Sequence, residues 1–373
     1  MTIAIDGRSL QGARGGIDVY TYQLLSRLFT QYTQHSYILF FNASTSFAHP
    51  FSESANLQIV HTHIPSKLFN TSLMVAHYPK LDEYLEKNTG RRIDLFFMPN
   101  MNFAAFSSRA RVIVTIHDLN YIHYRDRQSL KGRWWHSALD PERLIKLCKG
   151  IITVSEHTKQ DIVSTYRISP KNVSVVHLGV EDQFQSHTSY CEALPIILAF
   201  CPQEGRKNIE SLIEAFARAR TLNEELQSAY LVLAGVSTLP KRIQVAIQKL
   251  RISQWVRCVP YMPRERRFAL LCSARVCAYP SIYEGFGLPP LEAFLAGVPV
   301  IAGAHSSIPE ISGSGAWLCD PCNIADLSEG LCTLYTNEAV RKHLMQQGKD
   351  RAARYRWDET ARQTVRVFEN ICA

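Results

Sequence analysis

The chain has 373 residues, which is long enough for two domains of ordinary size. Hydrophobic residues make up 46% of it and charged residues 20%, proportions that exclude an intrinsically disordered protein. The formal net charge of +8 favours anionic partners such as nucleotide phosphates, anionic lipid surfaces or nucleic acid. Charge alone does not choose among these partners.

The opening residues and the cysteines bear on location. Residues 1–6 lack the basic and then apolar pattern of a secretory signal, and no apolar run reaches the ~18 residues that span a bilayer. The ten cysteines are scattered, and the one C-x2-C pair, Cys319 and Cys322, has no second pair or histidine cluster at zinc spacing. We therefore expect a cytoplasmic protein without a bound metal.

Short apolar runs alternate with longer amphipathic stretches, the pattern of βα units around parallel sheets. The first predicted strands are Thr2–Asp6, Tyr37–Phe41, Leu95–Met98, Arg111–Ile116, Gly150–Val154 and Val173–His177. A polar segment, Glu181–Leu194, is interpreted as a linker. The second series is Pro195–Cys201, Tyr230–Gly235, Trp255–Tyr261, Arg275–Tyr279, Val298–Ala302 and Trp317–Cys319. This pattern predicts an α/β protein with two doubly wound, Rossmann-like domains facing a central cleft.

A glycine-bearing loop follows the first predicted strand. Gly15 and Gly16 stand just before a helix that is expected to begin near Ile17. The first N–H groups of a helix lack intrahelical partners, so such a loop can hold a phosphate. The signal is weak on its own, because ordinary turns explain most glycine-rich loops.

A polar pair, His117 and Asp118, follows the apolar strand that ends at Ile116. In doubly wound sheets ligands bind beyond the carboxyl ends of the strands. A neutral imidazole there could hydrogen-bond a ligand hydroxyl, with Asp118 orienting the ring. The alternative is a histidine with a purely structural role.

Two adjacent cations, Arg206 and Lys207, follow the first strand of the second series. Together they could clamp a diphosphate, the arginine through its fork and the lysine as a point charge. The alternative is a basic start to the next helix, which the helix dipole disfavours unless an anion is present.

The most informative segment lies between Tyr279 and Pro299. Glu284 precedes a glycine-rich turn and Glu292 lies inside the helix that follows, so the two carboxylates would reach different parts of one ligand. Gly287 allows close backbone approach, and Pro290 suits a first helical turn. An anion at the helix end with hydroxyls on either side describes a sugar nucleotide.

The segment from Tyr283 to Ala293 resembles the E-x7-E element of retaining glycosyltransferases with the GT-B fold, specifically glycosyltransferase family 4. The Gly15-Gly16 pair, His117-Asp118-Leu119 and Arg206-Lys207-Asn208 also resemble family segments, in the same chain order. The family often has Gly-Ile-Gly and then Arg before the tyrosine, where this chain has Asp18 and Val19. The resemblance implies an acceptor-side domain over residues 1–185 and a nucleotide-sugar domain over 195–356, with a terminal helix in 357–373 packing back on the first.

The resemblance also implies roles for individual residues. The catalytic set is His117, Glu284, Arg206 and Lys207, and the donor-binding set is Gly15, Gly16, Asp118, Phe286, Gly287, Leu288 and Glu292. The family's expected course is front-face transfer, in which a leaving phosphate oxygen takes the acceptor proton. The chain has no Asp-x-Asp, so the cations would replace a metal.

The sequences of these motifs are most similar to those of bacterial mannosyltransferases of O-antigen or capsule assembly. The resemblance implies GDP-mannose as co-substrate and no other cofactor. It also implies a glycan or polyprenyl-diphosphate-linked acceptor. UDP-sugars stay open. Residues 131–149 form a basic, aromatic stretch that could contact the inner face of the plasma membrane or pack on the first domain. Two other functions stay open: a sugar-nucleotide epimerase or hydrolase, and a non-catalytic scaffold. Nucleic acid is not expected, because the chain lacks an aromatic and basic sheet motif.

Overall fold

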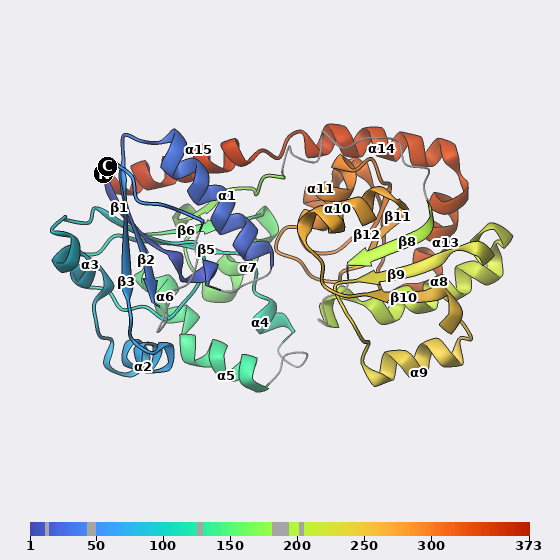
Figure 1. Ribbon diagram of the computed structural model, residues 1–373, viewed down its shortest axis with the longest axis horizontal. Coiled ribbons are helices and arrows are strands. Elements are labelled where there is room, and N and C mark those ends of the chain that lie inside the picture. The colour runs from blue at the N-terminus through green and yellow to red at the C-terminus, as the bar shows by residue number, and fades with distance from the viewer. Residues whose placement is uncertain (12–14, 43–49, 125–129, 181–193, 201–204) are drawn as a thin grey trace. The chain divides into compact units, whose positions relative to one another are not determined.

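The computed structural model describes residues 1–11, 15–42, 50–124, 130–180, 194–200 and 205–373. The chain forms two compact units, one made of Met1–Gly179 with Trp357–Ala373 and the other of Val180–Arg356 (Figure 1). The predicted linker, Glu181–Leu194, lies outside the described residues except for Leu194, which begins a strand.

The first unit is built on a parallel sheet, which has seven strands among the described residues. Their bounds are β1 (Thr2–Asp6), β2 (Ser36–Asn42), β3 (Leu57–Thr62), β4 (Leu95–Met98), β5 (Val112–Ile116), β6 (Gly150–Thr153) and β7 (Val173–Val175). Their order is β3-β2-β1-β4-β5-β6-β7, so the direction of winding reverses between β1 and β4. This reversal is where doubly wound sheets bind ligands.

Helices cover both faces of this sheet, and for that reason its central strands are continuous apolar runs. The helices described in this unit are α1 (Gly16–Gln31), α2 (Ser66–Thr71), α3 (Leu81–Thr89), α4 (Asn120–His123), α5 (Leu130–Leu139), α6 (Pro141–Leu147), α7 (Glu156–Tyr166) and α15 (Trp357–Cys372), with a π-helical turn at Ser72–Ala76. α15 is the last helix of the chain, yet it contacts α1 and β6.

The strand β3 is missing from the strands predicted on apolar runs. It lies at the edge of the sheet, paired only with β2 among the described residues, and its middle four residues are half-buried. An edge strand keeps polar residues such as Gln58 and His61, so it lacks the apolar run that marks a central strand.

The second unit repeats the same winding. Its strands are β8 (Leu194–Phe200), β9 (Tyr230–Ala234), β10 (Val256–Val259), β11 (Ala274–Tyr279), β12 (Val300–Gly303) and β13 (Ala316–Cys319), in the order β10-β9-β8-β11-β12-β13. Its helices are α8 (Ile209–Leu222), α9 (Lys241–Lys249), α10 (Arg264–Cys272), α11 (Leu288–Leu295), α12 (Ile308–Ser312), α13 (Ile324–Thr336) and α14 (Glu338–Ala352). The predicted class, two Rossmann-like domains with parallel sheets, is confirmed.

The chain passes from one unit to the other at residues 179–180 and again at 356–357. In the first unit, a Cβ on Gly179 would lie 2.2 Å from the backbone nitrogen of Trp357, so only glycine fits there. The Thr360 hydroxyl donates to the His177 carbonyl at 2.8 Å. Phe368 is fully buried, with its ring centroid 5.0 Å from that of Phe97. The terminal helix therefore completes the core of the first unit.

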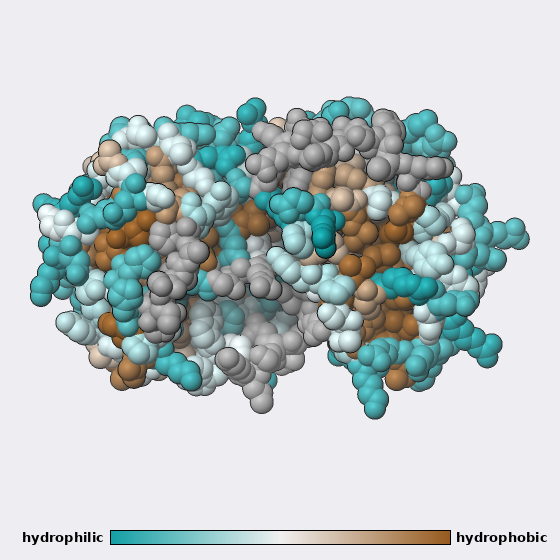
Figure 2. Space-filling view, in the orientation of Figure 1, coloured by the Kyte–Doolittle hydropathy of each residue, from teal (hydrophilic) through white to brown (hydrophobic). Residues whose placement is uncertain are grey.

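The surface of the first unit carries an apolar patch over α2 (Figure 2). Leu68 and Val75 contribute to it with 66% and 69% of their surface exposed. Trp134 on α5 is also largely exposed. In the part of the chain that the structure describes, no helix is long and apolar enough to cross a bilayer.

Candidate active site

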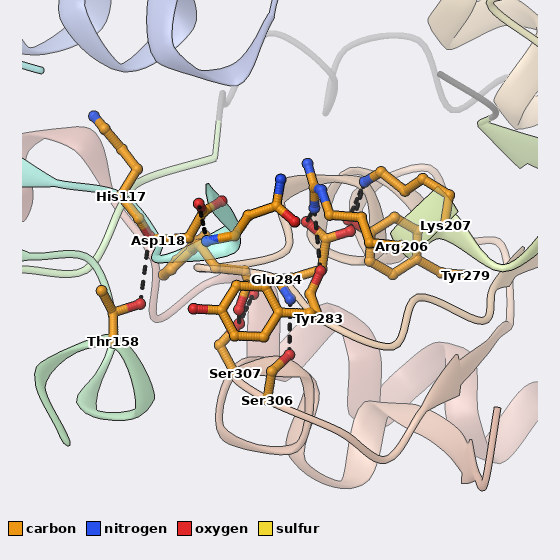
Figure 3. Close-up of polar contacts among 12 residues, drawn as sticks. His117, Asp118, Thr158, Arg206, Lys207, Tyr279, Tyr283, Glu284, Ser306 and Ser307 are labelled. Atoms are coloured by element: carbon orange, nitrogen blue, oxygen red, sulfur yellow. Dashed lines mark hydrogen bonds and ion pairs between the residues drawn. The ribbon is translucent and has the colours of Figure 1, made fainter. Parts of the chain in front are cut away.

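An ion cluster forms where the winding of the second sheet reverses, at the carboxyl ends of β8 and β11. A short 3-10 turn after β8, Gly205–Lys207, supplies two cations, and the loop after β11 supplies Glu284. Lys207 Nζ lies 2.6 Å from Glu284 Oε1, and Arg206 donates to Oε2 of the same carboxylate (Figure 3). The adjacency of β8 and β11 thus joins residues that are 77 positions apart.

Burial and charge act against each other at this cluster. Glu284 is 6% exposed and Lys207 8%. Burial by itself raises the pKa of the Glu284 carboxyl, but Lys207 and Arg206 outweigh it and lower the pKa to about 2. The carboxylate is therefore ionised at neutral pH. Two cations and one carboxylate leave the cluster with one unit of positive charge.

Three side chains that sequence reasoning missed hold this cluster in place. Lys207 Nζ donates to the Tyr279 hydroxyl at 3.0 Å. The Glu284 N–H donates to Ser306 Oγ at 2.8 Å, and the Ser307 hydroxyl lies 2.9 Å from the Glu284 carbonyl oxygen (Figure 3). Ser306 and Ser307 follow β12, so the available signal was again a polar pair after an apolar strand.

The loop after Glu284 leads directly into α11. Gly287 precedes the helix with a φ of 116°, a conformation that side-chain-bearing residues rarely adopt, and a Cβ there would lie 2.9 Å from Ile308 Cδ1. Phe286 is buried, and α11 begins at Leu288 with no side-chain cap from the described residues. In the first helical turn Leu288 carries an N–H, whereas Pro289 and Pro290 have none. Binding of a diphosphate by the N–H groups of Phe286, Gly287 and Leu288 stays a prediction.

The second carboxylate, Glu292, lies inside α11 and is 5% exposed. Its cation is Arg267 of α10, which donates to Glu292 Oε2. Arg267 was not predicted from the sequence, because nothing in α10 distinguishes it from the neighbouring Arg264 and Arg266. The two glutamates thus share one unit but are held by different cations.

His117 lies at the carboxyl end of β5, in the first unit, and is half-buried. Its Nε2 lies 3.0 Å from the Pro99 carbonyl oxygen, which can only accept, so Nε2 carries the proton. Burial lowers the pKa of His117 to about 4, although the Pro99 carbonyl opposes this. The ring is therefore neutral, and Nδ1 is left as a hydrogen-bond acceptor. The Thr158 hydroxyl donates to the backbone oxygen of His117 (Figure 3).

The expectation that Asp118 orients the His117 ring stays a prediction. Asp118 Oδ1 accepts the N–H of Asn120 at 3.0 Å, which places the carboxylate at the start of α4. The described contacts of the His117 ring are with the Pro99 carbonyl oxygen and with Tyr20, whose ring centroid is 4.8 Å away. Short aspartates commonly bond a backbone N–H two residues further on, and that local bond competes with longer-range ones.

Gly15 and Gly16 lie at the start of α1, as predicted for a helix beginning near Ile17. Here the departure from the family wording has a structural role, because the Gly15 N–H donates to Asp18 Oδ2 at 3.2 Å. Burial raises the pKa of the Asp18 carboxyl, while the Gly15 bond opposes this. A diphosphate at this helix start would meet the Asp18 carboxylate, so a role for the glycine pair in donor binding stays a prediction.

The predicted residues fall into two groups. Arg206, Lys207, Glu284, Phe286–Leu288 and Glu292 lie in the unit Val180–Arg356, whereas Gly15, Gly16, His117 and Asp118 lie in the other unit. Cys319 is buried in β13 and Cys322 is exposed. Within the described ranges, no group of three or more His, Cys, Asp or Glu residues could hold a metal ion.

Two known families match the two halves of the sequence. Residues 14–184 match the family described as Glycosyltransferase Family 4, and residues 192–351 match Glycosyl transferases group 1. O-antigen chain mannosyltransferase B of Escherichia coli is 26% identical over 277 residues, which are 69% of this chain and 70% of that protein. MMP alpha-(1->4)-mannosyltransferase of Mycolicibacterium hassiacum is 30% identical over 66% of this chain, and the match spans 60% of that protein's length.

Solved structures show the same fold over nearly the whole chain. Sucrose-phosphate synthase from Thermosynechococcus elongatus superposes with a TM-score of 0.72 at 18% identity, covering 99% of this chain and 98% of that one. WaaG, a glycosyltransferase involved in lipopolysaccharide biosynthesis, superposes with a TM-score of 0.69 at 15% identity, covering 98% of this chain and 99% of that one. These likenesses confirm the predicted GT-B fold.

Proposed function

Since the chain belongs to the glycosyltransferases that combine a Family 4 domain with a group 1 domain, we propose that it transfers a mannosyl residue from GDP-mannose to a saccharide acceptor, with retention of configuration. The acceptor is a glycan or a lipid-linked saccharide of a cell-surface polysaccharide. The observation that carries the proposal is the buried cluster of Arg206, Lys207 and Glu284 at the switch point of the second sheet.

The cluster suits the departure of a nucleoside diphosphate. As the bond from the sugar C1 to the β-phosphate oxygen breaks, negative charge grows on the diphosphate. Arg206 and Lys207 are already oriented by their bonds to Glu284, so they stabilise that charge without rearranging. The start of α11 adds the N–H of Leu288, its first residue. We infer that these groups supply the stabilisation that a metal ion provides in other transferases.

The transfer needs no side chain as nucleophile. The new bond from the acceptor oxygen to C1 forms on the face that the diphosphate leaves, and the acceptor proton passes to the departing phosphate oxygen. Glu284 is ionised, but both its oxygens are engaged by cations, which makes it a poor nucleophile. Each carboxylate oxygen can accept a second hydrogen bond, so we assign Glu284 to binding hydroxyls of the donor sugar. We assign Glu292 to the ribose.

His117 contributes as a neutral hydrogen-bond acceptor. Pro99 holds the proton on Nε2, so Nδ1 can accept a hydrogen bond from a sugar hydroxyl at any pH above the pKa of about 4. A protonated imidazole could not accept at either nitrogen. We therefore assign the neutral His117 ring to binding a sugar hydroxyl, with no part in proton transfer.

The choice of mannose rests on the relatives. Both relatives described above are named mannosyltransferases, and one of them is named for O-antigen chains. The choice of GDP rests on the resemblance of the motifs alone, because no contact to a base can be assigned.

We also propose that the first unit touches an anionic membrane surface through residues 131–149. In this stretch Trp134 is 63% exposed, while Trp135 packs edge-on against Phe103 with the ring centroids 5.7 Å apart. An exposed tryptophan beside basic residues is typical of surfaces that bind at the lipid headgroups. The apolar patch over α2 would enlarge that surface.

The first experiment measures thermal stabilisation by GDP, UDP and ADP, each with and without EDTA. We expect GDP alone to stabilise the wild type, and EDTA to leave the effect unchanged. Lys207→Ala should abolish the shift and lower kcat/KM for GDP-mannose by about a hundredfold or more, because one preorganised cation is lost. Lys249→Ala is the matched control, since Lys249 is an exposed lysine of the same unit.

Transfer itself is tested by incubating radiolabelled GDP-mannose with extracted lipid-linked saccharides and determining the anomeric configuration of the product. Stabilisation by UDP in place of GDP would overturn the donor assignment. Release of mannose without any acceptor dependence would identify a hydrolase. No stabilisation by any nucleotide would remove the basis of the transferase proposal.

A further inference from the structure

We propose that Arg267 is a positioning residue for Glu292, and that through Glu292 it makes the protein select ribonucleotides over deoxyribonucleotides. The inference rests on the proposed function, in which Glu292 binds the ribose of the donor. It goes further by assigning nucleotide-sugar selection to a residue of α10 that no motif of the sequence marks.

The contact joins three elements of one unit. Arg267 lies on α10, its Nη2 donates to Glu292 Oε2 on α11, and its guanidinium carbon lies 4.9 Å from the ring centroid of Phe200, the last residue of β8. The side chain of Glu292 is 6% exposed and that of Arg267 is 36% exposed. The guanidinium is thus fixed from one side by an aromatic face and holds the carboxylate on the other.

Glu284 and Glu292 differ in how many of their carboxylate oxygens are bonded to a cation. Both oxygens of Glu284 are engaged, Oε1 by Lys207 and Oε2 by Arg206. At Glu292 only Oε2 is engaged by a described residue, since Arg267 is its single partner there. Oε1 has no partner among the described residues. It is not one of the side-chain atoms that are cut off from water without a partner, so it borders accessible space. Oε2 is therefore held by Arg267, and Oε1 can accept a hydrogen bond from a ligand.

This arrangement lies where a nucleotide is expected. Phe200 is at the carboxyl end of β8, next to the switch point of the sheet, and Glu292 lies in the second turn of α11. A buried carboxylate is costly unless a cation pairs with it. Arg267 supplies that charge and restricts the rotamer, so that Oε1 keeps one direction. A ribose hydroxyl donating to Oε1 would then meet a preorganised, charged acceptor.

A hydrogen bond to a charged group of this kind changes the affinity for the ligand that makes it by roughly tenfold to a hundredfold. We therefore expect GDP to bind the wild type about ten to a hundred times more tightly than the deoxy analogue lacking the hydroxyl that Glu292 accepts. Without Arg267 the buried carboxylate loses the cation that pairs with it and the restraint on its rotamer, and the advantage of the hydroxyl is lost.

The experiment measures dissociation constants of GDP, 2′-deoxy-GDP and 3′-deoxy-GDP by calorimetry, together with the melting temperature of each variant. The variants are Arg267→Met, Arg267→Lys and Glu292→Gln. The matched control is Arg266→Met, the same change at the exposed neighbouring residue of α10. We expect the ribo-to-deoxy ratio of Arg267→Met to fall to that of Glu292→Gln, Arg267→Lys to restore part of it, and the control to keep the wild-type ratio.

The outcomes separate this inference from the proposed function. If the wild type binds no nucleotide, the proposed function fails and the inference fails with it. If the wild type discriminates and Arg267→Met discriminates equally well, the inference alone is overturned, even where the melting temperature falls, because Arg267 would then serve stability only. If the wild type binds GDP and both deoxy analogues equally, Glu292 does not read the ribose and the inference also fails.

Discussion

At the residue scale, the surroundings of each ionisable group decide what it can do. His117 is half-buried and Glu284 is buried, yet the first is kept neutral and the second is kept charged. The difference lies in their partners, since His117 faces a backbone carbonyl and Glu284 faces two cations. Burial favours the neutral form of any group unless opposite charge outweighs it.

The neutral state of His117 predicts a pH dependence of stability. The folded-state pKa of about 4 lies below the ordinary value of 6.5, so between these values only the unfolded chain takes up the proton. This contribution to the free energy of unfolding is fully present above about pH 6.5 and is lost as the pH falls to about 4. It amounts to up to about 3 kcal/mol for a fully buried ring and less for the half-buried ring here.

The check is urea unfolding of the wild type and of His117→Asn from pH 4 to pH 8. We expect the free energy of unfolding to depend less on pH in the variant. The change His343→Asn, at an exposed histidine of α14, is the control and should leave the wild-type profile unchanged. Identical profiles for all three proteins would mean that His117 is not held neutral by burial.

At the element scale, short segments after strands carry most of the proposed chemistry. A three-residue turn after β8 supplies Arg206 and Lys207, and an eight-residue helix after β11 supplies Glu292. α11 is apolar almost all round and buried from Pro290 to Leu295, so it is a fixed part of the core. The start of α11 is assigned to the diphosphate and Glu292 to the ribose of the same ligand. A rigid helix keeps these two groups at a fixed separation.

The helix α5 gives a prediction of a different kind, because its exposed Trp134 is not needed by the core. We expect Trp134→Ser to weaken binding to vesicles of phosphatidylglycerol and phosphatidylcholine by about fivefold or more in a sedimentation assay, with the melting temperature nearly unchanged. Vesicles of phosphatidylcholine alone should bind weakly, since the charge complementarity is absent.

Leu222→Ser is the control for that assay. Leu222 ends α8 in the second unit and is 61% exposed, so it is an apolar residue of similar exposure outside the proposed surface. Equal loss of binding in both variants would indicate nonspecific adhesion. Unchanged binding of Trp134→Ser would exclude α5 from the contact.

At the scale of the whole molecule, the chain crosses twice between its units, and its last helix belongs to the first one. α15 is strongly amphipathic in its burial: Trp357, Ala361, Val365 and Phe368 are buried and Arg366 is exposed. The core of the first unit is complete only when α15, the last helix of the chain, packs on it. Contacts in this core therefore join residues that are far apart in the sequence.

Removing the Phe368 side chain should therefore destabilise the first unit selectively. We expect Phe368→Ala to lower its free energy of unfolding by about 3–5 kcal/mol, the usual cost of truncating a buried phenylalanine. GDP binding should persist, because the cations and carboxylates assigned to the nucleotide belong to the second unit. Calorimetric scans with and without GDP would show the variant's lower transition moving independently of the GDP-stabilised one.

Arg366→Ala, at an exposed position of the same helix, is the control and should change stability by less than about 0.5 kcal/mol. A loss of GDP binding in Phe368→Ala under conditions where the second unit is folded would contradict this division of labour between the units.

Much of this protein is readable from its sequence because the signals are local. Apolar runs mark the central strands, and Gly287 with Pro290 marks the start of α11 next to Glu284. The terminal helix expected in 357–373 spans Trp357–Cys372 in the structure. Each of these features depends on residues within a turn or a strand of one another. The edge strand β3 was not predicted because its middle four residues are only half-buried and include polar side chains.

Only the tertiary structure decided which side chains meet. Glu284 and Lys207 touch across 77 positions because β8 and β11 are neighbours, and Glu292 meets Arg267 because α10 and α11 pack together. Asp118 accepts a backbone N–H two residues away, and the His117 ring meets the carbonyl oxygen of Pro99, 18 residues before it. Spacing along a chain determines which element a residue joins. The partner of a side chain depends on how distant elements pack, and that packing is set by the burial of the whole core.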